Sequence, residues 1–304
     1  MTDPRRPGGS SAADSPGPND DQSFDDRGLD TWGEEGRFEV SRERIVEYAE
    51  ATNDPIGAHR SGDVAPPVFA VVPVFPSLAT PAVGVLPARL VPQIVHGEQD
   101  FHFHRPLYPG DKLVSRGKII GYAGLEKGTP CAILLECRTE DGDLVNEQYV
   151  TFFVRKFNAG KKVGKLSPSH KFDEQLRAQP PLAKATAHVD DDQTYRYAKA
   201  SGDPMPIHLD EDFAKSAGLP GIIAHGLCTM AMTSWGVLTE VGGSDVHRLK
   251  RFAVRFAKMV LPGDNLETRI WKTGAGGGVT RYAFETVRGE DFVITDGLAE
   301  IADA

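Results

Sequence analysis

The 304-residue sequence is poor in cysteine and has no long apolar run. Its three cysteines, Cys131, Cys137 and Cys228, are odd in number and show no metal-ligand spacing. This usage argues against a disulfide framework and a zinc site, and it favours a reducing compartment. No apolar run approaches the roughly 18 residues that a membrane-spanning helix needs, and the N-terminus is polar rather than signal-like. We therefore expect a cytoplasmic protein that does not enter a membrane.

Basic residues are fewer than acidic ones: the sequence has 34 Lys and Arg against 43 Asp and Glu, and the net charge is -9. An acidic total argues against a broad nucleic-acid surface, although it leaves room for a local basic pocket. The 40% hydrophobic content allows a core of normal size, and the length suits one large or two modest domains.

Large apolar side chains are nearly absent from residues 1–33, where Pro, Gly, Ser and Asp cluster. Such a segment cannot bury enough surface to offset the entropy of ordering, so we predict a disordered tail, with docking of its aspartates on a basic partner as the alternative. A second polar stretch, 158–184, reads as a connection between two domains, 34–157 and 185–304.

The two domains are related by an internal repeat. Residues 48–59 align with 197–208 at a constant offset of 149, and 103–111 align with 256–264 at an offset of 153. Such ordered agreement indicates duplication.

Each half has the same coarse order of elements: a short helix, an irregular loop, a more apolar segment and several strand-like runs. This order predicts an α+β layer in which an antiparallel sheet wraps a central helix. The strand-like runs are 99–105, 112–122, 131–140 and 144–157 in the first half, and 251–260, 265–272, 280–287 and 291–299 in the second.

The second half carries a candidate active site. Asp203 and His208 lie five residues apart on a Gly/Pro-rich loop, where proton-transfer groups are often found. Gly226 follows His225 and opens an apolar run, so its backbone N–H would lie at a helix N-terminus that favours negative charge. Each residue has a plainer interpretation: a turn aspartate, a structural histidine, a helix cap. Their joint occurrence within residues 195–238 favours an acid–base pair facing an oxyanion site.

This stretch resembles the hydratase motif of the R-specific enoyl-CoA hydratases, the MaoC-like proteins of the hot-dog superfamily. The blocks 94–113 and 254–266 resemble other parts of the same family. The resemblance implies a double hot dog, with two repeats paired edge to edge and the active site near their junction. The matching residues are Tyr197, Ser201, Gly202, Asp203, Pro206, Ile207, His208, Asp210, Phe213, Ala214, Ala217, Gly218, His225, Gly226, Leu227, Cys228 and Thr229.

The activity that the resemblance implies is reversible hydration of a trans-2-enoyl-CoA to a (3R)-3-hydroxyacyl-CoA. Asp203 would orient and deprotonate water, His208 would share that task and protonate C2, and the Gly226 N–H would meet the charge on the thioester oxygen. No cofactor is implied beyond the CoA of the substrate, and a homodimer is left open. Two alternatives remain: a (3R)-hydroxyacyl-ACP dehydratase acting on acyl-carrier-protein thioesters, and a non-catalytic acyl-thioester binding protein.

Further substrate-binding positions follow from the resemblance, and each also has a structural interpretation. His225, His96 and Gly97 match His-Gly pairs, and Phe256 matches an aromatic residue at the substrate. Lys127 resembles a CoA contact, and Ser234 a serine that assists the oxyanion site. One departure is Met205, because the family motif usually has asparagine there and a thioether makes no strong hydrogen bond.

The first half looks degenerate. It retains Asp54 and His59 at the same interval, but no His-Gly helix start follows them in the same order, so we predict turn and packing roles rather than a second active site. Six prolines predict that its central helix, within 64–86, is broken into a looser element. They are Pro66, Pro67, Pro73, Pro76, Pro81 and Pro87. The resemblance implies that this half holds the acyl chain.

Overall fold

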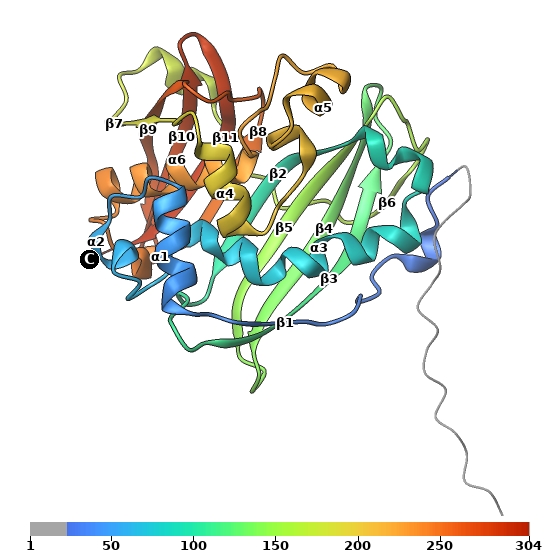
Figure 1. The fold of residues 1–304 in the computed structure, drawn as a ribbon, viewed down its shortest axis with the longest axis horizontal. Coiled ribbons are helices and arrows are strands. Elements are labelled where there is room, and N and C mark those ends of the chain that lie inside the picture. The colour runs from blue at the N-terminus through green and yellow to red at the C-terminus, as the bar shows by residue number, and fades with distance from the viewer. Residues whose placement is uncertain (1–22, 304) are drawn as a thin grey trace, which may run out of the picture.

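The structure is a computed structural model that describes residues 23–303. Its main element is one continuous antiparallel sheet. Its eleven strands in this part of the chain run in the order β1-β3-β4-β5-β2-β8-β11-β10-β9-β7, and the short β6 pairs with β3 (Figure 1). The first half contributes β1-β3-β4-β5-β2 and the second β7-β9-β10-β11-β8, which is the same order once each half is numbered from its own start. The topology therefore confirms the duplication and the predicted α+β double hot dog.

The elements of the first repeat follow the predicted order. The strands are β1 (Gly36–Glu39), β2 (Ile94–Phe103), β3 (Lys112–Ala123), β4 (Gly128–Thr139) and β5 (Leu144–Arg155). The helices are α1 (Arg42–Ala51), α2 (Gly57–Arg60) and α3 (Val71–Val85). Ser41 caps α1 by accepting a hydrogen bond from the Arg44 N–H, which satisfies one free donor of the first turn.

The second repeat has the same plan and adds the helix α5 (Glu211–Ser216), because the counterpart of α2 is the 3-10 helix Pro206–His208. Its strands are β7 (Ala183–His188), β8 (Leu249–Phe256), β9 (Asn265–Gly276), β10 (Val279–Arg288) and β11 (Asp291–Ala302). Its helices are α4 (Gln193–Ser201), α5 (Glu211–Ser216) and the central α6 (Gly226–Val241), whose side chains are mostly buried. No helix within residues 23–303 is long and apolar enough to cross a membrane.

Helix α3 corrects the prediction of a broken helix. It is continuous through Pro76 and Pro81 and lies across β3 and β4 (Figure 1). Each proline removes only one backbone donor, and close packing on the sheet offsets that loss. The Ser77 and Ser115 hydroxyls are 3.0 Å apart, and a Cβ on Gly117 would lie 2.7 Å from the Ser77 carbonyl oxygen. The helix therefore sits against the sheet without the predicted looseness.

The ordered chain begins earlier than composition predicted. Residues 23–33 were assigned to the tail, yet Phe24 is 5% exposed and packs against Tyr122 and Phe157. The Asp30 N–H donates to the Ile119 carbonyl at 2.8 Å, which ties the segment to β3. Phe24, Leu29 and Trp32 together supply the apolar surface that orders this segment. The rest of the predicted tail, 1–22, lies outside the described residues.

The connection between the repeats packs along the sheet. Its strand β6 (Lys162–Gly164) pairs with β3, and Phe172 meets the Trp271 ring edge to face. Further on, Arg177 binds the buried carboxylate of Glu285 through two nitrogens, at 2.9 and 2.7 Å. Bidentate pairs of this kind fix direction, so the connection is held on both repeats.

The repeats join where β2 pairs with β8. Across this seam Arg251 donates to both oxygens of the buried Asp100 carboxylate, and its pKa is raised by that partner against the effect of burial. Helices α1 and α4 also lie side by side (Figure 1), and their equivalent tyrosines, Tyr48 and Tyr197, share a buried hydroxyl–hydroxyl hydrogen bond of 3.2 Å. The junction thus contains both sheet and side-chain contacts.

Candidate active site

The end of α4 directs the chain toward the candidate residues. Gly202 has φ 80°, and its N–H donates to the Ala198 carbonyl, so the helix stops in the left-handed conformation that glycine adopts without strain. Asp203 follows at once and is partly exposed. Its carboxyl Oδ1 accepts the Met205 N–H at 3.2 Å, and its own N–H donates to the Ser201 hydroxyl at 3.3 Å. The loop thus holds the carboxyl group in a tight turn.

His208 closes a short 3-10 helix (Pro206–His208) and is 7% exposed. Its Nδ1 lies 2.7 Å from the Ile223 carbonyl oxygen. Because a carbonyl can only accept, Nδ1 carries the hydrogen and Nε2 keeps a free lone pair. Burial lowers the pKa of His208, while the Ile223 carbonyl and Asp203 oppose that shift. The ring is therefore a neutral base near pH 7.

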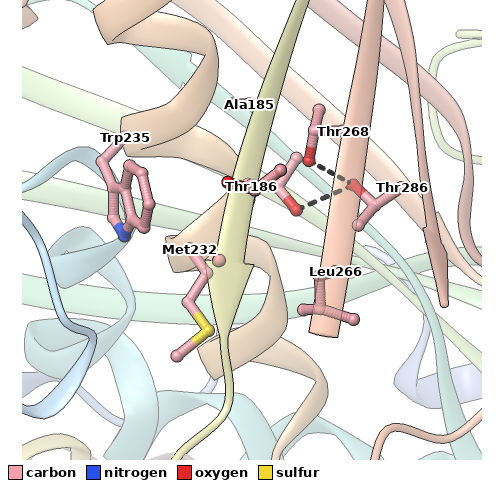
Figure 2. Close-up of a pocket in the computed structure, with 9 residues that line it drawn as sticks. Ala185, Thr186, Met232, Trp235, Leu266, Thr268 and Thr286 are labelled. Atoms are coloured by element: carbon pink, nitrogen blue, oxygen red, sulfur yellow. Dashed lines mark hydrogen bonds between the residues drawn. The ribbon is translucent and has the colours of Figure 1, made fainter. Parts of the chain in front are cut away.

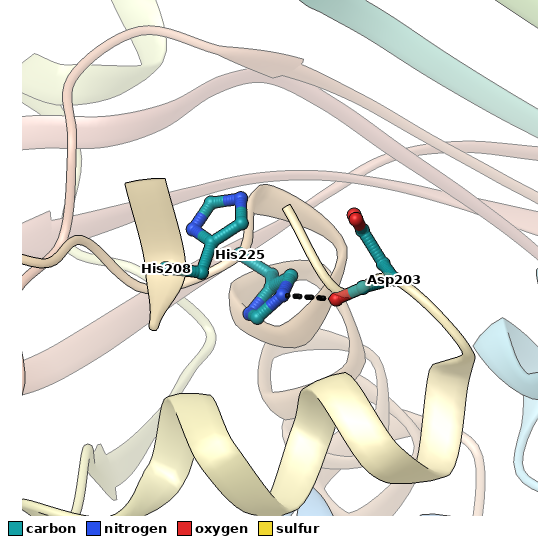
Figure 3. Close-up of side chains that lie close together, drawn as sticks. All are labelled: Asp203, His208 and His225. Atoms are coloured by element: carbon teal, nitrogen blue, oxygen red, sulfur yellow. Dashed lines mark hydrogen bonds between the residues drawn. The ribbon is translucent and has the colours of Figure 1, made fainter. Parts of the chain in front are cut away.

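His225 lies directly beneath this ring (Figure 3). The two imidazoles stack with centroids 3.7 Å apart and planes at 26°. The Nε2–H of His225 donates to the backbone carbonyl of Asp203 at 3.1 Å, and Tyr197 contacts the ring at 4.9 Å between centroids. Burial, followed by the neighbouring His208, lowers the pKa of His225 to about 3, so this ring is neutral.

Gly226 begins α6 with an N–H in the first helical turn, where backbone donors have no acceptor within the helix. A Cβ at this position would lie 3.2 Å from the Phe256 ring, so a side chain here would be crowded. Phe256 comes from the end of β8 and meets His96 of β2 at 5.0 Å between ring centroids. The helix start therefore faces the seam between the repeats.

The structure thus brings together Asp203, His208, His225, Gly226, Phe256 and His96, the last with Gly97 beside it. His96 is a neutral ring, because burial lowers its pKa to about 4. Its buried Nε2 has no hydrogen-bond partner among residues 23–303.

Two predicted residues lie apart from this group. Ser234 donates its hydroxyl to the Ala231 carbonyl and is buried, eight residues beyond Gly226 and so about 12 Å along α6. Lys127 is exposed in the turn between β3 and β4. Neither contacts the grouped residues through any hydrogen bond or ion pair recorded for the described chain.

The main-chain contacts of the site could not be found from sequence. The Ile223 carbonyl fixes the tautomer of His208, and the Asp203 carbonyl fixes that of His225. Every residue has a carbonyl group, so these partners leave no sequence signal. The stacked imidazoles are likewise a product of the loop geometry.

The three side chains also need testing as a metal site, because donor atoms of Asp203, His208 and His225 all lie within 4.8 Å of one another. Two imidazoles that share a metal must aim their lone pairs at one point about 2 Å from each nitrogen. A ligand lone pair lies in the plane of its ring, and planes stacked at 26° with centroids 3.7 Å apart do not meet close to both nitrogens. The Nε2–H of His225 is also already engaged. The arrangement suits proton transfer and does not fit a metal ion.

A separate small hollow lies between α6 and the strands β7, β9 and β10 (Figure 2), and it has no room for a water molecule. The Thr286 hydroxyl bridges those of Thr233 and Thr268 at 3.0 and 2.9 Å there. None of the candidate site residues lines it. Its hydroxyl groups satisfy one another, so it is part of the core.

Comparison with known proteins agrees with this geometry. The MaoC-like domain model matches residues 173–291, and the FAS1-like dehydratase domain region matches residues 28–148. A probable enoyl-CoA hydratase 2 of Dictyostelium discoideum is 30% identical over 211 residues, 68% of this chain and 70% of that protein. The 3-hydroxyacyl-thioester dehydratase Y of Mycobacterium tuberculosis is 30% identical over 244 residues, 76% of this chain and 81% of that protein.

Solved structures show the same fold. A MaoC-like dehydratase from Phytophthora capsici superposes with a TM-score of 0.80 at 24% identity, covering 92% of this chain and 99% of that one. A Mycobacterium tuberculosis protein described as a double hot dog has a TM-score of 0.57 at 13% identity, covering 90% and 96%. The relatives are named enoyl-CoA hydratases and 3-hydroxyacyl-thioester dehydratases, so the class of protein is a hydro-lyase with two fused hot dogs. The chain belongs to the MaoC-like double hot-dog family of R-specific enoyl-CoA hydratases.

Proposed function

We propose that this protein adds water reversibly to a trans-2-enoyl-CoA to give a (3R)-3-hydroxyacyl-CoA. The observation that carries the proposal is the state of His208. Its Nδ1–H is bound to a backbone carbonyl, so its Nε2 lone pair is free beside the partly exposed Asp203 carboxyl group. A neutral imidazole and a carboxylate arranged in this way can hold one water molecule between them.

The reaction divides between these groups in a simple way. The water oxygen attacks C3 of the double bond while Asp203 and His208 take up its proton. Electron density moves onto the thioester oxygen, and the Gly226 N–H at the start of α6 donates to that oxygen. The enolate then collapses as His208 returns a proton to C2, so one water is consumed and no cofactor is needed.

The acyl thioester would lie along the seam of the two repeats. Phe256 and His96 offer a wall of neutral rings from β8 and β2 beside Gly226. Lys127, exposed on the same repeat as His96, is proposed as a contact for the CoA part, where a flexible cation suits phosphate. Ser234 is not assigned a part, because its hydroxyl is bound within α6.

A second candidate is dehydration of a (3R)-hydroxyacyl thioester on an acyl carrier protein. It is favoured by the match of residues 28–148 to a fatty-acid-synthase dehydratase region and by the relative named a 3-hydroxyacyl-thioester dehydratase. The chemistry is the same reaction in reverse. The carrier of the thioester is what separates the two candidates.

The deciding experiment supplies purified protein with crotonyl-CoA, longer and branched enoyl-CoAs, and the same acyl groups on acyl carrier protein. Loss of the conjugated thioester absorbance gives the rate, and chiral analysis gives the configuration of the product. Asp212→Asn is a suitable control, because it removes an exposed carboxylate of α5 outside the site. An (S) product, or no turnover of any thioester, would reject the assignment.

A further inference from the structure

His225 touches both members of the acid–base pair although it is only 2% exposed. Its Nε2–H holds the main chain of Asp203, and its ring lies against the ring of His208. We propose that His225 is a positioning residue, rather than a substrate contact, which fixes the Asp203 backbone and the plane of the His208 ring. This inference rests on the proposed function, since it concerns the same two proton-transfer groups.

The first contact fixes the loop that carries Asp203. The loop leaves α4 through a left-handed glycine, Gly202, and has no regular hydrogen-bond ladder of its own. The Ser201 hydroxyl holds the Asp203 N–H, and His225 holds the Asp203 carbonyl on the other side of the residue. With both backbone groups held, the direction of the carboxyl group is set, and a displacement of about 1 Å can lower a rate by about a hundredfold.

The second contact fixes the plane of His208. A single hydrogen bond from Nδ1 to the Ile223 carbonyl selects the tautomer, but it allows the ring to tilt about that bond. A second ring at 3.7 Å limits the tilt. His225 also immediately precedes Gly226, so the same residue links the acid–base pair to the proposed oxyanion donor.

His225 has no charge to contribute. Its pKa is lowered to about 3. Among its neighbours on the adjoining helices, Arg196 of α4 is charged and acts on Cys228, whereas Cys228 and Tyr197 are neutral. Burial raises the pKa of Cys228 on α6 to about 12 and that of Tyr197 on α4 well above its usual range. Across the seam, His96 on β2 is neutral. Any change in the pH profile on replacing His225 must therefore arise from a changed environment of His208 beside Asp203.

The test compares three replacements with a matched control. His225→Ala removes both contacts, His225→Gln keeps a donor for the Asp203 carbonyl, and His225→Phe keeps a ring. His170→Ala is the control, because His170 is also a buried histidine on a backbone carbonyl, that of Asp296 at 2.5 Å, but lies in the connection between the repeats.

For His225→Ala we expect kcat to fall about ten- to hundredfold while KM changes less than about threefold. The acid limb of the kcat profile should move to higher pH, because water reaching His208 returns its pKa toward the ordinary value of about 6.5. His225→Gln should recover part of kcat, and His225→Phe should recover the position of the acid limb. His170→Ala should keep the wild-type kcat and acid limb.

Three results would overturn the inference: wild-type kcat with an unmoved acid limb in His225→Ala, a rise in KM alone, or a fall in kcat that His170→Ala matches. The first two point to a spectator or a substrate contact, and the third to a general loss of fold. If His225→Ala does not fold, kcat and the acid limb of His225→Gln and His225→Phe are compared with those of the wild type and His170→Ala. Failure of the proposed function looks different, because the wild-type protein itself would then be inactive on every thioester.

Discussion

The two repeats keep the same aspartate and histidine at the same spacing, yet they use them differently. In the first repeat the His59 Nδ1 lies 2.7 Å from the Asp54 carboxyl oxygen, and the two side chains are 0% and 1% exposed. In the second repeat the His208 Nδ1 donates to the Ile223 carbonyl instead, and Asp203 remains partly exposed. The two pairs thus share the spacing and differ in the acceptor of the histidine Nδ1–H, and we propose that this difference makes only the second pair catalytic.

The acceptor in the second repeat lies in the loop that follows the added helix α5. After His208 the chain passes through α5 and returns with Ile223, whose carbonyl meets the imidazole. After His59 the chain runs directly into the 3-10 helix that leads to α3, and the ring is left to bind Asp54. Because this pair is closed and buried, we propose that Asp54 and His59 have a structural role rather than a catalytic one.

The largest expected effect separates the two aspartates by activity. Asp203→Asn keeps the size of the side chain and removes the base, so kcat should fall about 10²–10⁴-fold. Asp54→Asn still offers His59 an acceptor, and kcat should stay within about threefold of the wild-type value. Initial rates on crotonyl-CoA with matched protein concentrations measure both. Equal losses in the two variants would mean that both repeats take part in the chemistry.

Stability should separate the two histidines in the opposite sense. His59→Leu leaves the buried Asp54 carboxyl without its imidazole partner, and breaking such a pair lowers the free energy of unfolding by about 3–5 kcal/mol. His208→Leu leaves a carboxyl group that still reaches water, so its effect on stability should be smaller while activity is lost. Denaturant unfolding monitored by circular dichroism gives both values. A larger destabilisation by His208→Leu would contradict the closed-pair description.

Sequence could predict the repeat, the antiparallel sheet around a helix in each half and the grouping of Asp203, His208 and Gly226, because those depend on periodicity and on side-chain identity. It failed at α3, where packing against Gly117 and Ser115 keeps a proline-containing helix continuous. It also failed at residues 23–33, where the buried Phe24 ring and the Asp30 N–H bond to Ile119 anchor the segment. In the site, the main-chain acceptors could not be predicted, since they depend on where the loops after His59 and His208 travel.

The pH dependence sharpens the comparison further. Protonation of His208 removes its Nε2 lone pair, so activity should fall as the pH falls. Because burial lowers the pKa of His208, the acid limb of kcat/KM should have its midpoint below 6.5. Rates measured from pH 4.5 to 8 for the wild type and for Asp54→Asn should share one acid limb, whereas a limb that moves with Asp54 would implicate the first repeat.

The smallest effect is expected at the residue two positions after each aspartate. Met205 and Ile56 both donate a backbone N–H to the aspartate Oδ1, at 3.2 and 2.9 Å, so the turn is the same in both repeats whatever the side chain. Met205 is 52% exposed and Ile56 is 6% exposed. Met205→Asn should therefore change the free energy of unfolding by less than about 0.5 kcal/mol, as for an ordinary surface substitution, and change kcat less than about threefold.

Ile56→Asn would bury an amide and should lower the free energy of unfolding by about 1–3 kcal/mol. A kcat that rises by more than tenfold in Met205→Asn would show that the asparagine side chain, rather than the shared backbone turn, holds the reacting water.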